Sequence, residues 1–135
     1  MMPGIVVGID GSANARSALV WAISEAAAHR APLTVLTVHD DFDLAAAQAE
    51  ATELTDKAVA ELGEAKPASI TVKAVHGPAA DGLLAGANGA DMLVLGARGG
   101  VQTGGLAAHS PVGSVSNKVL HRAKCPVVLI PASTS

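Results

Sequence analysis

The chain has 135 residues, a length that fits one domain and is enough to bury a sizeable core. Half of the residues are hydrophobic but few of them are large, which favours helices packed close against a sheet over a bundle of bulky side chains. The net charge of −3 excludes proteins that hold nucleic acid through clustered Lys and Arg, and Trp21 and Phe42 alone cannot form a stacking surface for bases.

The first half of the chain predicts two strands that alternate with two helices. Residues 4–9 (GIVVGI) are a short β-branched run, and helical spacing of apolar residues then predicts a helix from residue 13 to residue 30, ahead of Pro32. Residues 33–39 alternate as a strand does, and residues 43–64 predict a long second helix. The faces expected to point inward are Ala15, Ala18, Leu19, Ala22, Ile23, Ala26 and Ala27 in the first helix and Leu44, Ala47, Ala51, Leu54, Ala58 and Leu62 in the second.

The second half continues this alternation. Residues 69–76 predict a third strand, and residues 78–88 predict a short helix that glycines interrupt. The apolar run at residues 92–95 is typical of a buried strand, and a fourth helix is expected between residues 111 and 122. The run PVVLI at residues 126–130 predicts a fifth strand.

Strands that alternate with helices indicate an α/β fold, here a three-layer sandwich around a five-stranded parallel sheet. Ligands of such sheets lie beyond the carboxyl ends of the strands, where the strand order reverses. Gly8, Ile9 and Asp10 end the first strand, and residues 96–99 follow the fourth. With these two strands as neighbours at the reversal, the predicted order is 3-2-1-4-5 and both turns line one crevice.

The segment from Asp91 to Ser116 combines a buried strand, a glycine-rich loop and the start of a helix. Gly96 and Gly99 would let the backbone approach a ligand closely. Unpaired amides at the start of the helix attract an anion, and the hydroxyls of Ser114 and Ser116 can add hydrogen bonds to phosphate oxygens. The segment therefore predicts a phosphate cradle, although a flexible loop without a ligand gives a similar glycine pattern.

Motifs for catalysis and for metal binding are missing from the sequence. There is no Gly-Lys-Ser/Thr P-loop and no GxGxxG fingerprint. A triphosphate held without a committed lysine or a catalytic base is bound rather than efficiently hydrolysed, so no catalytic residue is predicted. No pair of histidines has metal-ligand spacing, and the single cysteine, Cys125, excludes an intramolecular disulfide.

The chain resembles the universal stress protein family over essentially its whole length, residues 1–135, as a single domain. The matching motifs are IVVGIDGS, ADMLVLGARG and GSVSNKVLHRAKCPVVLIP. Nucleotide-binding members carry Gly-x2-Gly-x9-Gly-(Ser/Thr), for which this chain supplies Gly96, Gly99, Gly113 and Ser114. The resemblance implies an adenine nucleotide alpha hydrolase-like fold that binds ATP or another adenine nucleotide, with Mg bridging the phosphates.

The resemblance also assigns contacts to individual positions. Gly8, Ile9 and Asp10 would lie beside the nucleoside, and Val38 would pack against adenine. Asp10 has a second interpretation as a cap of the first helix, and Arg98 as a solvated loop residue. The residues expected to line the ribose and phosphates are Leu95, Gly96, Ala97, Arg98, Gly99, Gly113, Ser114, Val115 and Ser116.

The loop between Gly99 and Gly113 departs from the family pattern. It contains thirteen residues, 100–112, which is four more than the motif allows. We expect the loop to bulge outward while both glycine anchors meet the phosphates. The alternative is that it folds inward and occludes the site.

Three functions follow from these patterns. The first is an ATP-binding, nucleotide-dependent regulator or scaffold in the stress response. The second is a family member that binds no nucleotide and acts through protein contacts, and the third is a slow ATPase or adenylyl-transferring enzyme on the same fold. The resemblance implies a homodimer that pairs through the strand at residues 126–130. This apolar run would otherwise leave a hydrophobic sheet edge exposed.

The sequence also predicts where the protein resides. The start, MMPGIVVGID, has neither the basic region nor the apolar run of a signal peptide. No segment reaches the ~20 apolar residues that span a bilayer. We therefore expect a soluble, cytoplasmic protein.

Overall fold

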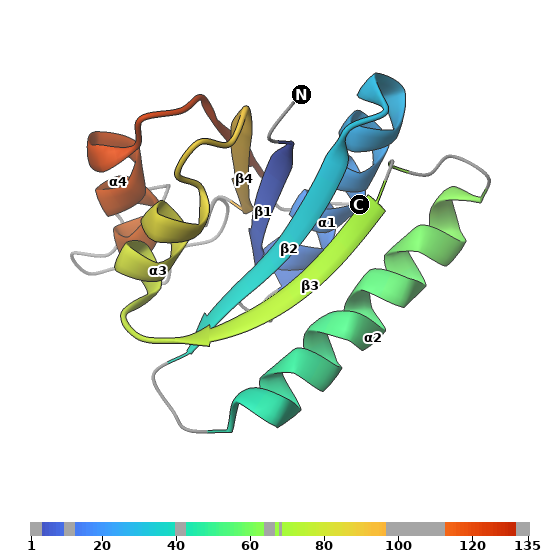
Figure 1. Cartoon of the computed structure of the whole chain (residues 1–135), viewed down its shortest axis with the longest axis horizontal. Helices are drawn as coiled ribbons and strands as arrows, with labels where there is room; N and C mark the ends of the chain where they lie inside the picture. The colour runs from blue at the N-terminus through green and yellow to red at the C-terminus, as the bar shows by residue number, and fades with distance from the viewer. Residues whose placement is uncertain are drawn as a thin grey trace.

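The fold is that of a computed structural model, which describes residues 4–9, 13–39, 43–63, 67, 69–96 and 113–131, with the backbone alone at 13, 14, 39 and 113–116. In these residues strands and helices alternate along the chain, as the sequence predicts (Figure 1). The elements are β1 (Ile5–Ile9), α1 (Ala13–His29), β2 (Pro32–His39), α2 (Leu44–Leu62), β3 (Ser69–His76), α3 (Ala79–Gly86), β4 (Met92–Gly96), α4 (Gly113–Arg122) and β5 (Val127–Ile130).

The five strands form one parallel sheet in the order β3-β2-β1-β4-β5. The central strand β1 pairs with β2 and β4, so that Val7 lies opposite Val35 on one side and Val94 on the other. Helices α1 and α2 cover one face, and α3 and α4 cover the other (Figure 1). The predicted three-layer α/β sandwich and its strand order are confirmed.

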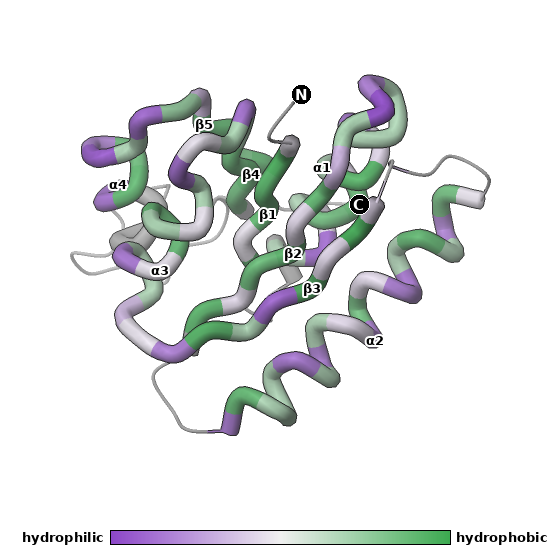
Figure 2. The backbone as a smooth tube through the Cα atoms, in the orientation of Figure 1, coloured by the Kyte–Doolittle hydropathy of each residue, from purple (hydrophilic) through white to green (hydrophobic). Residues whose placement is uncertain are grey.

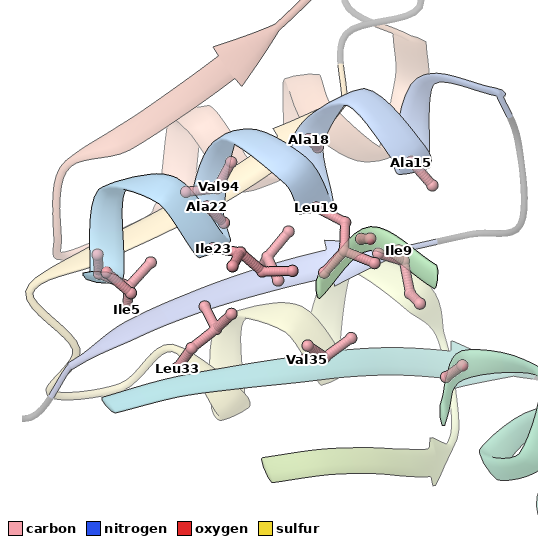
Figure 3. Close-up of a cluster of buried hydrophobic side chains, with 14 residues drawn as sticks. Ile5, Ile9, Ala15, Ala18, Leu19, Ala22, Ile23, Leu33, Val35 and Val94 are labelled. Carbon is pink, nitrogen blue, oxygen red and sulfur yellow. The ribbon is translucent and has the colours of Figure 1, made fainter. Parts of the chain in front are cut away.

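Both faces of β1 are buried, since alternate residues contribute to separate cores. Ile5, Val7 and Ile9 pack under α1, where Leu19 and Ile23 are fully buried (Figure 3). Four alanines of α1 belong to the same cluster and bring the helix close to the sheet: Ala15, Ala18, Ala22 and Ala26. Ala51 and Ala58 of α2 extend the cluster. Small side chains therefore set the spacing of the α1 layer, as the composition predicts.

The opposite core lies between the sheet and helices α3 and α4. Its buried members are Val6, Leu36, Ala80, Leu83, Ala87, Leu93, Leu95 and Val119. Figure 2 shows hydrophobic colour along β1 and β4 and alternating hydrophobic and hydrophilic segments along α2. A helix that is apolar on one side only covers a sheet face rather than lying inside the core.

Helix α2 starts one residue later than predicted. Asp43 is its N-cap, and the Asp43 carboxylate accepts a hydrogen bond from the Ala46 N–H at 3.0 Å. Thr55 is buried on the inward face, a position that an apolar pattern does not reveal. Its hydroxyl donates to the Ala51 carbonyl at 2.7 Å, which removes the cost of burying an unpaired polar group.

The glycine-interrupted helix predicted at residues 78–88 exists as α3, and its glycines have a packing role. A Cβ atom on Gly82 would lie 2.7 Å from Val38 Cγ1, and one on Gly86 would lie 2.4 Å from Leu36 Cδ2. Because glycine has no side chain, α3 approaches β2 more closely than another residue would permit. The two glycines thus position α3 over the sheet.

The amino end of β1 is tied to the start of β4. The Gly4 N–H donates to Asp91 Oδ2 at 3.1 Å, and the Asp91 N–H donates to the Gly4 carbonyl at 2.9 Å. Gly4 has φ +100°, and a Cβ there would lie 2.6 Å from the Pro32 carbonyl oxygen. The entry of the chain into the sheet therefore requires glycine.

Candidate functional site

The carboxyl ends of β1 and β4 lie side by side. Gly8 of β1 is paired with Leu95 of β4, and the strands end at Ile9 and Gly96. Strand order reverses between them, because β1 leads on to β2 on one side while β4 leads on to β5 on the other. The predicted neighbours are confirmed, and the two strands end beside each other at the same edge of the sheet.

The predicted residues fall into two groups by the face of the sheet toward which they point. Leu95 and Val38 point toward the α3 and α4 layer, where Leu95 is buried and Val38 is partly buried, and a Cβ atom on Gly8 would point the same way. Ile9 faces the other way and is buried under α1. A ligand at this edge could therefore meet Ile9 through its backbone, because its side chain belongs to the opposite core.

The absence of a side chain at Gly8 is required by its neighbours. A Cβ atom there would lie 2.5 Å from Leu83 Cδ2 and 2.9 Å from Leu95 Cδ2. The sequence assigns Gly8 to the ligand and does not reveal that Leu83 packs against it. The spacing of the glycines in α3 is the signal for this contact, because it predicts a helix that packs tightly on the sheet.

Helix α4 begins at Gly113, the third glycine of the motif. The helix leads into β5, whose first residue Val127 is paired with Leu93 near the start of β4. The carboxyl end of α4 therefore lies toward the amino edge of the sheet, and its amino end lies toward the carboxyl edge. The first backbone N–H groups of a helix have no partner within the helix, so they are available to an anion there.

Asp10, Ala97, Arg98 and Gly99 lie outside the described residues, as does the loop at 100–112. The structure describes Gly113, Ser114, Val115 and Ser116 by their helical backbone alone. Their roles remain predictions.

A cavity of about 500 Å³ lies between α3 and the carboxyl end of α4. It touches none of the residues predicted from the sequence to bind nucleotide. Arg122 Nη1 donates to Asp81 Oδ1 across the two helices at 3.1 Å, with both side chains 60% exposed, so this pair contributes little to stability. The lining residues are Asp81, Leu84, Ala85, Ala87, Asn88, Arg122, Ala123, Lys124 and Cys125.

Neither a reactive thiol nor a metal cluster is found in the described part of the chain. Burial raises the pKa of the Cys125 thiol, which favours the neutral form over the nucleophilic thiolate. Within the residues described, no three His, Cys, Asp or Glu side chains are grouped so as to hold a metal ion. No described helix has the length and apolarity to cross a membrane.

Comparison with known proteins identifies the family. The model of the universal stress protein family matches residues 1–131. The chain belongs to the universal stress protein family. A universal stress protein of Mycobacterium tuberculosis is 32% identical over 136 residues, which cover 96% of this chain and 48% of that protein. The chain thus spans about half the length of the curated relatives it matches.

Solved universal stress proteins share the fold. One, crystallised in complex with cAMP, is 30% identical, with a TM-score of 0.71 and 96% of each chain covered. Another, from Archaeoglobus fulgidus, is 26% identical, with a TM-score of 0.73 over 96% of this chain and 98% of that chain. The architecture is therefore the adenine nucleotide alpha hydrolase-like fold that the resemblance implies.

Proposed function

We propose that this universal stress protein binds ATP or another adenine nucleotide at the carboxyl edge of the sheet, between β1 and β4. Two observations support the proposal: β1 and β4 are paired at Gly8 and Leu95, so their ends lie together, and α4 runs so that its start at Gly113 lies toward the same edge of the sheet. The cAMP complex of a relative that is 30% identical supports the same ligand class.

The nucleotide would be held largely by backbone groups. Adenine would pack near Val38, with Gly8 to Asp10 beside the nucleoside. Arg98 and Gly99 would approach the ribose and first phosphates. The amides at the start of α4, with Ser114 and Ser116, would hold the phosphate tail, since a helix start favours negative charge. Mg²⁺ would bridge phosphate oxygens, because it is usually bound through substrate phosphates and a few protein oxygens.

Calorimetric titration with ATP and Mg²⁺ tests this proposal. The wild-type protein should bind, and Gly99→Val should abolish binding by filling space that the ribose or phosphates need. Ser114→Ala should weaken binding by roughly tenfold, which is the loss of one hydrogen bond to a charged group. Ser69→Ala provides a matched control, since Ser69 lies exposed at the amino end of β3, and it should bind as the wild type does.

The longer loop at residues 100–112 favours a second candidate, a family member that works through protein contacts without nucleotide. Absence of heat at millimolar ATP from folded protein would favour this candidate and reject the first. Mass spectrometry of the protein as purified gives an independent answer, because a retained adenine nucleotide would contradict the second candidate.

The biological role that we propose is a nucleotide-dependent regulator or scaffold of the stress response, acting in the cytoplasm as one domain. We also propose a homodimer through β5. This strand is outermost in the sheet, and its four apolar residues, Val127–Ile130, are all only half-buried. An apolar edge strand with free backbone groups is a template for pairing with another strand.

Sedimentation at micromolar concentration tests the dimer. The expected result is a species of twice the chain mass, with slow amide exchange in Val127–Ile130. A monomer across the concentration range would contradict the dimer and would leave the nucleotide proposal standing, since the proposed site lies between β1 and β4 of one chain.

A further inference from the structure

One side chain of α2 bonds to the backbone of the outermost strand β3. The Gln48 Nε2 donates to the Val72 carbonyl at 2.7 Å, and the Ala74 N–H donates to Gln48 Oε1 at 2.9 Å. These two residues flank Lys73, which is paired with Leu36 of β2 on the inner side. A single side-chain amide thus occupies two of the outward-pointing backbone groups at the middle of the sheet edge.

This arrangement imitates a neighbouring parallel strand. In a parallel ladder, a residue opposite Lys73 donates to the carbonyl of the residue before it and accepts from the amide of the residue after it. Those are the two groups that Gln48 occupies. A further strand therefore cannot form its central hydrogen bonds with β3 while Gln48 is in place.

The rest of β3 has the features of an edge that accepts another strand. It is eight residues long, contains no proline, and alternates exposed with half-buried side chains along most of its length. Helix α2 runs alongside it (Figure 1). A long edge strand promotes association between copies of a chain unless its backbone groups are occupied.

We propose that Gln48 closes the β3 edge to strand addition by a second copy of this chain. In the described part of the molecule, no side chain bonds in this way to the backbone of β5, at the other end of the sheet. The two ends of the sheet are therefore unequal in how their outer backbone groups are occupied. This inference concerns β3 alone and holds whether or not the wild-type protein dimerises.

The test compares Gln48→Met with the wild type and with Glu50→Met. Methionine keeps the length of the Gln48 side chain and removes both hydrogen bonds, whereas Glu50 is exposed on the same helix. In dilute Gln48→Met protein, the Ala74 amide should exchange roughly tenfold faster than in the wild type. At high concentration, sedimentation should detect species larger than those of the wild type, and Glu50→Met should form none.

A cysteine at position 73 reports whether the new contact is at β3. In a Cys125→Ser background, Lys73→Cys should form an intermolecular disulfide under mild oxidation at least tenfold more in the presence of Gln48→Met than with Gln48 intact. Equal cross-linking with either residue would overturn the proposal. Faster exchange at Ala74 without larger species would also overturn it, because α2 itself would then keep other copies away.

Discussion

Leu19→Ala is expected to lower the free energy of unfolding by about 2–5 kcal/mol, a large share of the stability of a single domain. Leu19 is fully buried and packs with Ile9 and Ile23 between α1 and the sheet (Figure 3). Truncation to alanine removes apolar contacts and leaves a cavity, because the neighbouring strands are fixed by hydrogen bonds on both sides. Urea denaturation measures the change.

Leu120→Ala is the matched control for this experiment. The chemical change is the same, but Leu120 is 41% exposed on α4. Its free energy of unfolding should change by less than about 1 kcal/mol, since a side chain that stays in contact with water gains little from folding. Equal losses for the two variants would mean that α1 does not pack on the sheet as described.

Gly8→Val is expected to destabilise the protein by about 3 kcal/mol, at the upper end for an overpacked core. The first carbon of the new side chain already overlaps Leu83 Cδ2 and Leu95 Cδ2, which are 2.5 Å and 2.9 Å from it. Both leucines are buried, so they can move only by displacing their own neighbours. Thermal or urea unfolding followed by circular dichroism measures the effect.

A double-mutant cycle with Leu83→Ala identifies the overlap as the cause. Leu83→Ala alone leaves a cavity, and Gly8→Val alone overfills the same space, so the two changes compensate in part. The loss in free energy of unfolding in the double variant should be at least about 1 kcal/mol smaller than the sum of the losses in the two single variants. Additive losses would show that the cost at Gly8 arises from the strand backbone and not from Leu83.

Much of the fold could be predicted because hydrophobic period and chain order determine it. The β-branched run of β1 and the alanine stripe of α1 have different periods, and their alternation along the chain leaves few topologies other than a parallel sheet. Strand order was the less direct step. Glycines at the ends of β1 and β4 predict that these two strands are neighbours, and the pairing of Gly8 with Leu95 confirms it.

Other features depend on contacts between distant residues, which a local pattern does not reveal. Thr55 is inward although it is polar, because its hydroxyl bonds within its own helix. Gly82 and Gly86 weaken the helical pattern of α3, yet they are what lets α3 lie close to Val38 and Leu36. Propensity scales record the cost of glycine in a helix but not the gain from close packing.

The candidate site is predicted only in part. The position of Ile9 at the end of β1 can be predicted from the sequence. The direction of its side chain cannot, because both faces of β1 are buried and apolar residues alternate between two cores. Asp10 and Arg98 lie outside the described residues, so their contacts stay a prediction.

The tie between Gly4 and Asp91 has a practical consequence for binding measurements. It fixes the point where the chain enters the sheet at the amino edge, and β1 then spans about 17 Å to the opposite edge. A fluorophore or solid support attached at the amino edge of the sheet would lie across the sheet from the proposed nucleotide. β5 ends at the opposite, carboxyl edge, since Ile130 is paired with Gly96, so an attachment at the amino edge keeps the support away from the proposed site.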